Sequence, residues 1–363
     1  MTAMAMRPFV NQVDVAVVGL GPAGASAAAI AAQAGLGVLA FDRKKTAGKP
    51  VQCAEFVPAM LGHEIGGIDA VAQQLIYRMR SFVEQQQPDE TPDFRGHMVD
   101  RERLDAQLVA QARAMGAKCE MAVGLAEIAS DGILETTDGQ CYRPRLLIGA
   151  DGPHSKVGRA IGSRNVALVE TRQITVPLLQ PHDATDIFLR ADIIGGYGWL
   201  FPKGGVANLG LGVLPQERAR LKPLLDELHL ALADQGRVGR DVLQHTGGAI
   251  PVGGMLKCVG ALQGVPVLLA GDAAGLTNPI TGAGIPAAIQ SGMMAGAAAK
   301  AWFAGDAQAL ANYEEELEDL FQSSLARACL RRNELLAQYA RSKQPDAAAL
   351  RRGWIAYDAY WAA

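Results

Sequence analysis

Three closely spaced glycines and the acid that follows them suggest the first chemistry in this chain. Gly19, Gly21 and Gly24 have the spacing G-x-G-x-x-G, and Asp42 lies downstream. In this pattern the first glycine allows a tight turn, the second lets the backbone approach a pyrophosphate, and the third lets a helix pack closely on a strand. The acid is placed to accept hydrogen bonds from a ribose diol. The spacing therefore predicts a dinucleotide-binding site.

The elements that must position these residues follow from the surrounding pattern. The apolar, β-branched run at 13–18 predicts a buried parallel strand, an Ala-rich helix continues to about Gln33, and a second strand at 37–42 ends at Asp42. The N-terminus of that helix would present free backbone N–H groups to phosphates. The motif by itself does not distinguish NAD from FAD.

Composition argues against several functional classes. The 363 residues carry a net charge of −3 without a basic stripe, so nucleic acid is not an expected partner. The five cysteines never have CxxC spacing, which favours a reducing compartment and argues against structural zinc or an iron–sulfur cluster. The N-terminus lacks the pattern of a secretory signal, and we expect a cytoplasmic protein. The uncharged segments 15–41 and 282–299 are mostly Ala and Gly, which favours buried helices over membrane spans.

Further segments extend the α/β pattern. Residues 99–116 have apolar residues at helical spacing, with Asp100 as the expected N-cap and Arg101 at the start of the helix. Arg101 could reach a cofactor or lie on the surface, and the pattern favours neither. Residues 145–162 predict a strand, a DG turn and a short helix, and residues 265–270 predict a strand that leads into GDAAG.

Four motifs in this order resemble the FAD-dependent oxidoreductases of the p-hydroxybenzoate hydroxylase type. They are GxGxxG, R-x-x-L-D, GADGxxSxVGR, and GDAAG followed by P-x-T-G-x-G-I, and they cover roughly residues 12–305. The resemblance implies an α/β fold in which a Rossmann-like FAD-binding domain carries an inserted β-rich substrate domain and a C-terminal helical segment. The expected boundaries are 1–75, 95–162 and 250–305 for the FAD-binding domain, 76–94 and 163–249 for the substrate domain, and 306–363 for the helical region.

Three tracts are similar to a narrower group, the geranylgeranyl reductase family. YGWLFPKGGVANLGLGV is similar to its YxWxFP signature, KPVQCAEFV is similar to its loop around Cys53, and the GDAAG segment also matches, although the family more often has Glu in place of Ala283. Members of this family saturate C=C bonds of polyprenyl chains. The resemblance implies an FAD-dependent reductase that transfers a hydride from reduced flavin to an isoprenoid of geranylgeranyl type or to another apolar alkene.

The same resemblance implies a set of FAD contacts. Asp272 would bond the ribityl hydroxyls, and Gly284 and Ile285 would open a helix whose N-terminus points at the flavin ring and stabilises the negative charge of the reduced form. Val123, in the strand-like CEMAVG, would contact the adenine through its backbone. The expected contacts are Gly19, Gly21, Ala23, Gly24, Asp42, Arg43, Cys53, Ala54, Arg101, Val123, Asp272, Pro279, Gly282, Gly284 and Ile285.

The expected substrate cavity is aromatic. Tyr197, Trp199 and Phe201 would line it beside the flavin ring, because a prenyl chain offers no charge to bind. We expect strands at 185–193 and 206–213 with this tract between them, so that FP followed by KGG places Trp199 at a strand–turn edge. A core aromatic cluster is the alternative role for these three residues.

Cys53 completes the set of candidate catalytic residues. We expect it to contact FAD, whereas a role as a reactive thiol would require an electropositive, partly open setting. Glu55 is an alternative proton source on position alone. Lys203 could hold a diphosphate, but the following glycines favour a solvated turn lysine.

Other functions on the same scaffold remain open. One is an FAD-dependent monooxygenase or halogenase that uses oxygen, and another is a non-catalytic flavin redox sensor or electron carrier. NAD(P)H or a ferredoxin would reduce the flavin, and the sequence shows no second G-x-G-x-x-G for NADPH. The pattern predicts long helical structure over 307–340, followed at 346–361 by an aromatic tail that we expect to dock on the protein's own surface, with peripheral membrane contact as the alternative. The oligomeric state is left open.

Overall fold

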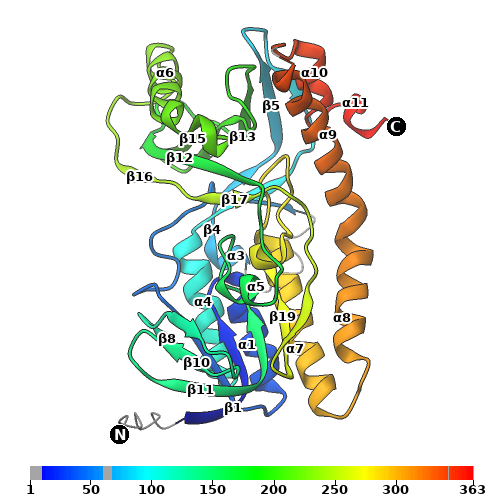
Figure 1. Ribbon diagram of the computed structural model, residues 1–363. Coiled ribbons are helices and arrows are strands. Elements are labelled where there is room, and N and C mark those ends of the chain that lie inside the picture. The colour runs from blue at the N-terminus through cyan, green and yellow to red at the C-terminus, as the bar shows by residue number, and fades with distance from the viewer. Residues whose placement is uncertain (1–9, 60–67, 342, 363) are drawn as a thin grey trace, which may run out of the picture.

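Two large sheets lie towards opposite ends of the molecule, and the C-terminal helices run along one side of both (Figure 1). The computed structural model describes residues 10–59, 68–341 and 343–362. The N-terminal residues 1–9, which belong to the segment expected to lack a signal peptide, are outside the described residues.

The first sheet is built around parallel strands. Its spatial order is β18 (Val259–Leu262), β19 (Val265–Leu269), β11 (Cys141–Gly149), β1 (Val10–Val18), β2 (Val38–Asp42) and β8 (Lys118–Met121), with β10 (Leu134–Thr136) beside β11 and β9 (Leu125–Ile128) beside β10. The strands from β19 to β8 pair in parallel, so their carboxyl ends meet at one edge. Ligands of such sheets bind outside this edge. The glycine motif, Asp42 and the GDAAG segment all follow these ends, which brings them together.

Three helices pack together beside this sheet, and the first and last of them consist mainly of small side chains. They are α1 (Pro22–Gln33), α4 (Arg101–Ala114) and α7 (Ile285–Phe303), and a shorter helix, α5 (Lys156–Ala160), follows β11. The contact between α1 and α7 is backbone to backbone, because a Cβ on Gly292 would lie 2.1 Å from the Ala23 carbonyl oxygen. This close approach explains the Ala/Gly composition that superficially resembles a membrane span. No helix in the described part of the chain is long and apolar enough to cross a membrane.

The second sheet is mostly antiparallel. Its order is β16 (Gln244–Thr246), β12 (Leu168–Pro177), β15 (Val206–Val213), β14 (Gly198–Lys203), β13 (Ala184–Leu189), β5 (Arg78–Val83) and β6 (Asp89–Thr91), with β17 (Ala249–Pro251) also paired to β12. A 3₁₀ turn (Pro215–Arg220) leads into α6 (Leu221–Asp234), whose leucines pack on one face of this sheet.

The tract YGWLFPKGG, expected to lie between two strands, itself forms a strand over most of its length. The tract forms strand β14, which pairs with β13 on one side and β15 on the other, and Trp199 lies within it. Pro202 is tolerated because β14 has only the β15 partner at that position, so no ladder bond to β13 is lost there. The predicted strand at 185–193 also ends earlier, at Leu189.

A small third sheet carries the loop around Cys53. Its order is β3 (Phe56–Pro58), β7 (Gly96–Val99) and β4 (Ala72–Ile76), and α3 (Ile68–Val71) precedes β4. Strand β3 pairs in antiparallel with β7, which leads directly into α4. Through these pairings the Cys53 loop is held against the start of α4.

The C-terminal helices connect the two ends of the molecule. α8 (Ala309–Leu317) continues through a π-helical turn (Glu318–Gln322) into α9 (Ser323–Ala340), which runs towards the second sheet and is followed by α10 (Ala347–Arg352) and α11 (Asp358–Trp361) (Figure 1). Tyr313 donates a 2.7 Å hydrogen bond to the Leu269 carbonyl and so fastens α8 to the end of β19. Trp354 and Tyr360 are buried, as expected for a tail that docks on its own protein, whereas Trp361 is exposed. The predicted α/β fold with a β-rich unit and a helical C-terminal segment is confirmed.

Candidate active site

The glycine motif forms a turn with open space in front of a helix N-terminus. Gly19 has a φ of 97°, and a Cβ there would lie 2.3 Å from the Ala150 carbonyl oxygen. A Cβ on Gly24 would lie 1.8 Å from the Gly19 carbonyl oxygen, whereas Gly21 has nothing within 4 Å of its Cβ position. The first turn of α1 has no acid and no side-chain cap, so its N–H groups remain available. This arrangement fits a pyrophosphate in front of Gly21.

Asp42 braces the same turn from the end of β2. Its Oδ2 accepts a 2.8 Å hydrogen bond from the Leu20 backbone N–H, and its Oδ1 accepts a 2.8 Å hydrogen bond from the Lys44 backbone N–H. Val123 donates its backbone N–H to the Asp42 carbonyl at 2.9 Å, which brings the predicted adenine-side residues to one edge. Val123 does not lie in a strand as expected, because β8 ends at Met121.

Asp272 lies beneath the N-terminus of α7. Its Oδ1 accepts a 2.7 Å hydrogen bond from Thr277 Oγ1, and no residue in the described chain donates to its Oδ2. A Cβ on Gly284, the N-cap of α7, would lie 3.4 Å from Oδ1. Burial raises the pKa of Asp272, while the Thr277 bond and the charge of Arg101 oppose that rise. A carboxylate oxygen kept free at this position fits a ligand hydroxyl such as those of a ribityl chain.

Arg101 is not a surface residue. Its side chain is 15% exposed, and Nε and Nη2 bond the Asp105 carboxylate at 3.1 and 3.2 Å. Burial opposes the charge of Arg101, but Asp105 and the nearby thiol of Cys53 outweigh it, so the pKa of the guanidinium is raised. The structure therefore brings Arg101, Cys53 and Asp272 together and excludes the surface position for Arg101, whereas its contact with a cofactor stays a prediction.

The loop around Cys53 is anchored by a buried carboxylate. Glu55 is 4% exposed and has a φ of 70°, and its side chain accepts hydrogen bonds from the Arg101 backbone (3.0 Å), Lys203 Nζ (2.8 and 2.9 Å) and Asn208 Nδ2 (2.9 Å). All of these groups are donors facing the oxygens of Glu55, so this side chain ties the Cys53 loop to the start of α4 and to the second sheet. The interpretation of Lys203 as a solvated lysine is wrong, because its partner Glu55 is buried.

Two of the three predicted aromatic residues line a pocket. Tyr197 and Trp199 contribute to it together with the segment 279–282, which includes Pro279 and Gly282. The Tyr197 hydroxyl donates to the Thr281 carbonyl at 2.6 Å. Phe201 is not part of this lining and packs instead in the core, with its ring centroid 5.9 Å from that of Phe56.

A polar chain that the sequence did not reveal joins this pocket to the Cys53 loop. Trp199 Nε1 donates to Gln173 Oε1 at 2.9 Å, and Gln173 Nε2 donates to the Cys53 carbonyl at 3.1 Å. Gly210 makes room for the indole, because a Cβ there would lie 2.4 Å from Trp199 Cζ2. Gln173 lies on β12, and nothing in its surrounding sequence signals the contact. Among the described residues, no three or more His, Cys, Asp or Glu side chains are grouped so that they could hold a metal ion.

Comparison with known proteins identifies the family. A model of the FAD binding domain matches residues 12–186. The chain is 34% identical to digeranylgeranylglycerophospholipid reductase 2 of Methanopyrus kandleri over 85% of this chain and 83% of the relative. The chain belongs to the geranylgeranyl reductase family. Another member, digeranylgeranylglycerophospholipid reductase of Methanocella arvoryzae, is 31% identical over 87% of this chain and 85% of the relative. This protein is accordingly an FAD-dependent oxidoreductase.

Solved structures agree with this assignment. A geranylgeranyl bacteriochlorophyll reductase-like protein from Thermoplasma acidophilum superposes with a TM-score of 0.83 at 26% identity, covering 94% of this chain and 90% of that one. PqsL of Pseudomonas aeruginosa, described as a probable FAD-dependent monooxygenase, has a TM-score of 0.71 at 17% identity over 94% of this chain and 98% of its own. That second likeness shows the fold alone, and the monooxygenase alternative is not favoured.

Proposed function

We propose that this protein reduces C=C bonds of an isoprenoid substrate, with FAD as its cofactor and NAD(P)H or a ferredoxin as the source of electrons. The observation that carries the proposal is the pocket lined by Tyr197, Trp199 and the segment 279–282, which adjoins the N-terminus of α7. Aromatic and apolar walls suit a prenyl chain, which has no charge to pair. The names of the relatives, which are reductases of geranylgeranyl lipids, support the same substrate class.

The proposed FAD contacts are those expected from the sequence. The turn of Gly19, Gly21, Ala23 and Gly24 holds the pyrophosphate, and Asp42, Arg43 and Val123 surround the adenosine. Asp272 accepts from ribityl hydroxyls, and Cys53, Ala54, Arg101, Pro279, Gly282, Gly284 and Ile285 surround the ring. The chemistry that FAD supplies when bound is hydride transfer to one alkene carbon, with a proton added to the other.

The residues of the chain orient the two reactants. The uncapped N-terminus of α7 stabilises negative charge near Gly284 through its free N–H groups and dipole. Tyr197, fixed by its bond to the Thr281 carbonyl, holds the pocket wall against the segment that faces the flavin. Burial raises the pKa of the Tyr197 hydroxyl, so it remains a neutral donor at physiological pH. The Trp199–Gln173 bond sets the position of the Cys53 loop on the other side.

Peripheral membrane contact is a further part of the proposal, because isoprenoid lipids reside in bilayers. Leu320 and Leu330, both half exposed along the π-helical turn and α9, and Trp361 at the C-terminus offer apolar side chains for an interface. Cosedimentation with phosphatidylglycerol vesicles tests this idea. A triple change of these residues to serine should release the protein, and equal binding of the variant would refute the contact.

The reductase activity is tested with anaerobic stopped-flow mixing. The protein is reduced with dithionite and mixed with geranylgeranyl diphosphate, with a geranylgeranyl lipid, or separately with oxygen. Reoxidation by the alkene, with a product heavier by two hydrogens, supports the proposal. Absence of reoxidation by a panel of isoprenoids, with oxygen consumption coupled to an oxygenated product, would instead support the monooxygenase.

A further inference from the structure

One cation of the C-terminal helix α9 faces the pocket that contains Tyr197 and Trp199. Arg332 is 7% exposed and is the one charged residue among the described residues that line this pocket. Its Nη1 donates a 2.6 Å hydrogen bond to the Gly195 carbonyl, which fixes the orientation of the guanidinium. Its Nη2 is buried and has no hydrogen-bond partner within the described chain.

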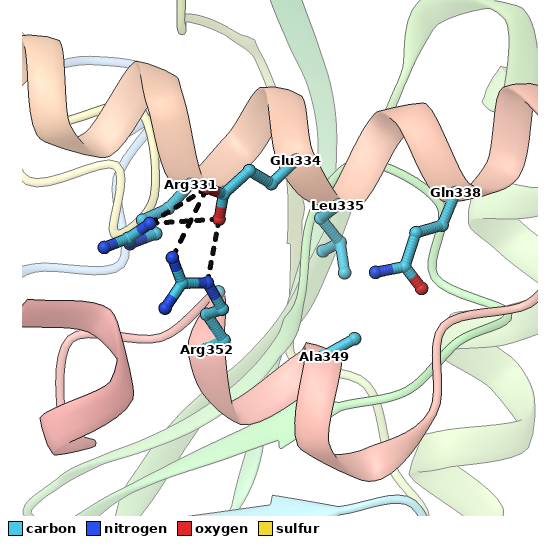
Figure 2. Close-up of a pocket in the computed structure, with 7 residues that line it drawn as sticks. Arg331, Glu334, Leu335, Gln338, Ala349 and Arg352 are labelled. Atoms are coloured by element: carbon cyan, nitrogen blue, oxygen red, sulfur yellow. Dashed lines mark hydrogen bonds and ion pairs between the residues drawn. The ribbon is translucent and has the colours of Figure 1, made fainter. Parts of the chain in front are cut away.

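The neighbouring arginine shows how this chain satisfies a buried guanidinium. Arg331, with 2% of its side chain exposed, bonds both oxygens of Glu334 through Nη1, at 3.0 and 3.1 Å, and the Tyr360 carbonyl through Nε at 2.8 Å. Its Nη2 donates to the Ala362 carbonyl. Arg352 of α10 shares the same carboxylate, as Figure 2 shows. Arg331 therefore fastens the C-terminal tail, and each of its three guanidinium nitrogens has a hydrogen-bond partner.

Arg332 lacks such a set of partners. The other deeply buried arginines pair with carboxylates, as Arg101 does with Asp105, whereas no carboxylate in the described chain pairs with Arg332. Burial lowers the pKa of Arg332 to about 10, so it is still charged at neutral pH. A buried charge with an unused donor is costly unless a ligand supplies the counter-ion. The complementary ligand group is an oxyanion, which a guanidinium binds through charge-assisted hydrogen bonds.

We propose that Arg332 determines substrate specificity by binding a phosphate group attached to the isoprenoid, while the aromatic part of the pocket holds the apolar chain. This assignment rests on the proposed function, because the proposed function identifies the pocket as the substrate site. Gly195 and Gly196 line the pocket beside Arg332, and the bond from Nη1 to the Gly195 carbonyl holds the guanidinium at this wall. The phosphate could belong to a free prenyl phosphate or to a lipid head group, which present the same oxygens to the guanidinium.

Calorimetric titration of the FAD-loaded protein tests the assignment without requiring turnover. The ligands are geranylgeranyl monophosphate, phosphatidic acid in detergent micelles, and uncharged geranylgeraniol. Arg332→Gln should weaken the phosphate-bearing ligand about 10- to 100-fold, the range for a hydrogen bond to a charged group, and leave geranylgeraniol within about twofold. Arg332→Lys should retain part of the affinity. Arg341→Gln, the same charge change at the exposed end of α9, should have no effect.

The outcomes separate this proposal from the reductase activity. If Arg332→Gln loses affinity for geranylgeranyl monophosphate alone, the phosphate that Arg332 binds belongs to a free prenyl phosphate. If the variant loses affinity for phosphatidic acid, the phosphate belongs to a lipid head group. Equal affinities in wild type and Arg332→Gln, or equal weakening of geranylgeraniol, would overturn the proposal. If Arg332→Gln does not fold, the wild-type protein is titrated in the presence of inorganic phosphate. Inorganic phosphate should weaken the binding of geranylgeranyl monophosphate and leave the binding of geranylgeraniol unchanged. Arg332-dependent binding without any alkene reduction would refute the reductase and keep the anion site.

Discussion

Removal of the Glu55 carboxylate should destabilise the protein far more than removal of an exposed acid with an equally short ion pair. Glu55→Ala leaves the Lys203 ammonium, with 21% of its side chain exposed, without its partner and leaves the Asn208 amide with only the longer bond, 3.3 Å, to the Ala54 carbonyl. Breaking a buried pair from one side costs about 3–5 kcal/mol. With an unfolding entropy of about 2.1 cal/mol/K per residue, this cost lowers Tm by roughly 4–7 °C for a chain of 363 residues.

The matched control is Glu102→Ala. Glu102 pairs with Lys49 at 2.8 Å, the distance between Lys203 and Glu55, but the two side chains are 39% and 57% exposed. Solvent screens such a pair, so we expect a loss below about 1 kcal/mol and a Tm change of about 1 °C. Thermal unfolding followed by circular dichroism measures both variants. The double variant Glu55→Ala/Lys203→Met should be more stable than Glu55→Ala, because it removes the unpaired cation. Equal Tm losses for Glu55→Ala and Glu102→Ala would refute the reasoning.

Three further predictions concern the cofactor, the substrate and pH. Asp272→Ala removes the carboxylate that we propose accepts from cofactor hydroxyls and should abolish most FAD retention on purification; an unimpaired, fully loaded variant would contradict the proposed contact. Trp199→Ala should lower isoprenoid turnover at least tenfold at unchanged FAD content. A loss of stability without a loss of turnover would mean that Trp199 serves only to pack the core. Burial favours the neutral form of Asp186, but hydrogen bonds from His182 and Arg80 outweigh it and lower its pKa to about 2, from 3.8. This group should therefore contribute about 2 kcal/mol of stability that is present above pH 4 and lost as the pH falls towards 2. Acid unfolding of Asp186→Asn should lack that component, and an acid transition identical to that of wild type would contradict it.

The glycine motif could be predicted because its requirements are local. Gly19 is needed by a tight turn, and Gly24 by the helix that packs closely behind it, a few residues further on. The spacing of the glycines therefore predicts the turn and the helix directly. The strand and helix bounds around the motif, including the end of α1 at Gln33, follow from apolar patterns with the same short range. The turn signals in the tract at 197–205 misled for the same reason, because the pairing of β14 with β13 and β15 is a property of the sheet.

By itself, the sequence determined that this chain has a dinucleotide-binding unit of parallel strands and a glycine turn, and its motifs indicated the family. Only the tertiary structure decided which groups Lys203, Gln173 and Arg332 contact. Lys203 meets Glu55 from 148 positions away, and Arg332 meets Gly195 from 137 positions away. The sequence around such residues contains no local pattern that distinguishes a solvated side chain from a buried one. Their environment is set when the two sheets and α9 pack together, because burial and partners, not residue type, fix what a charge can do.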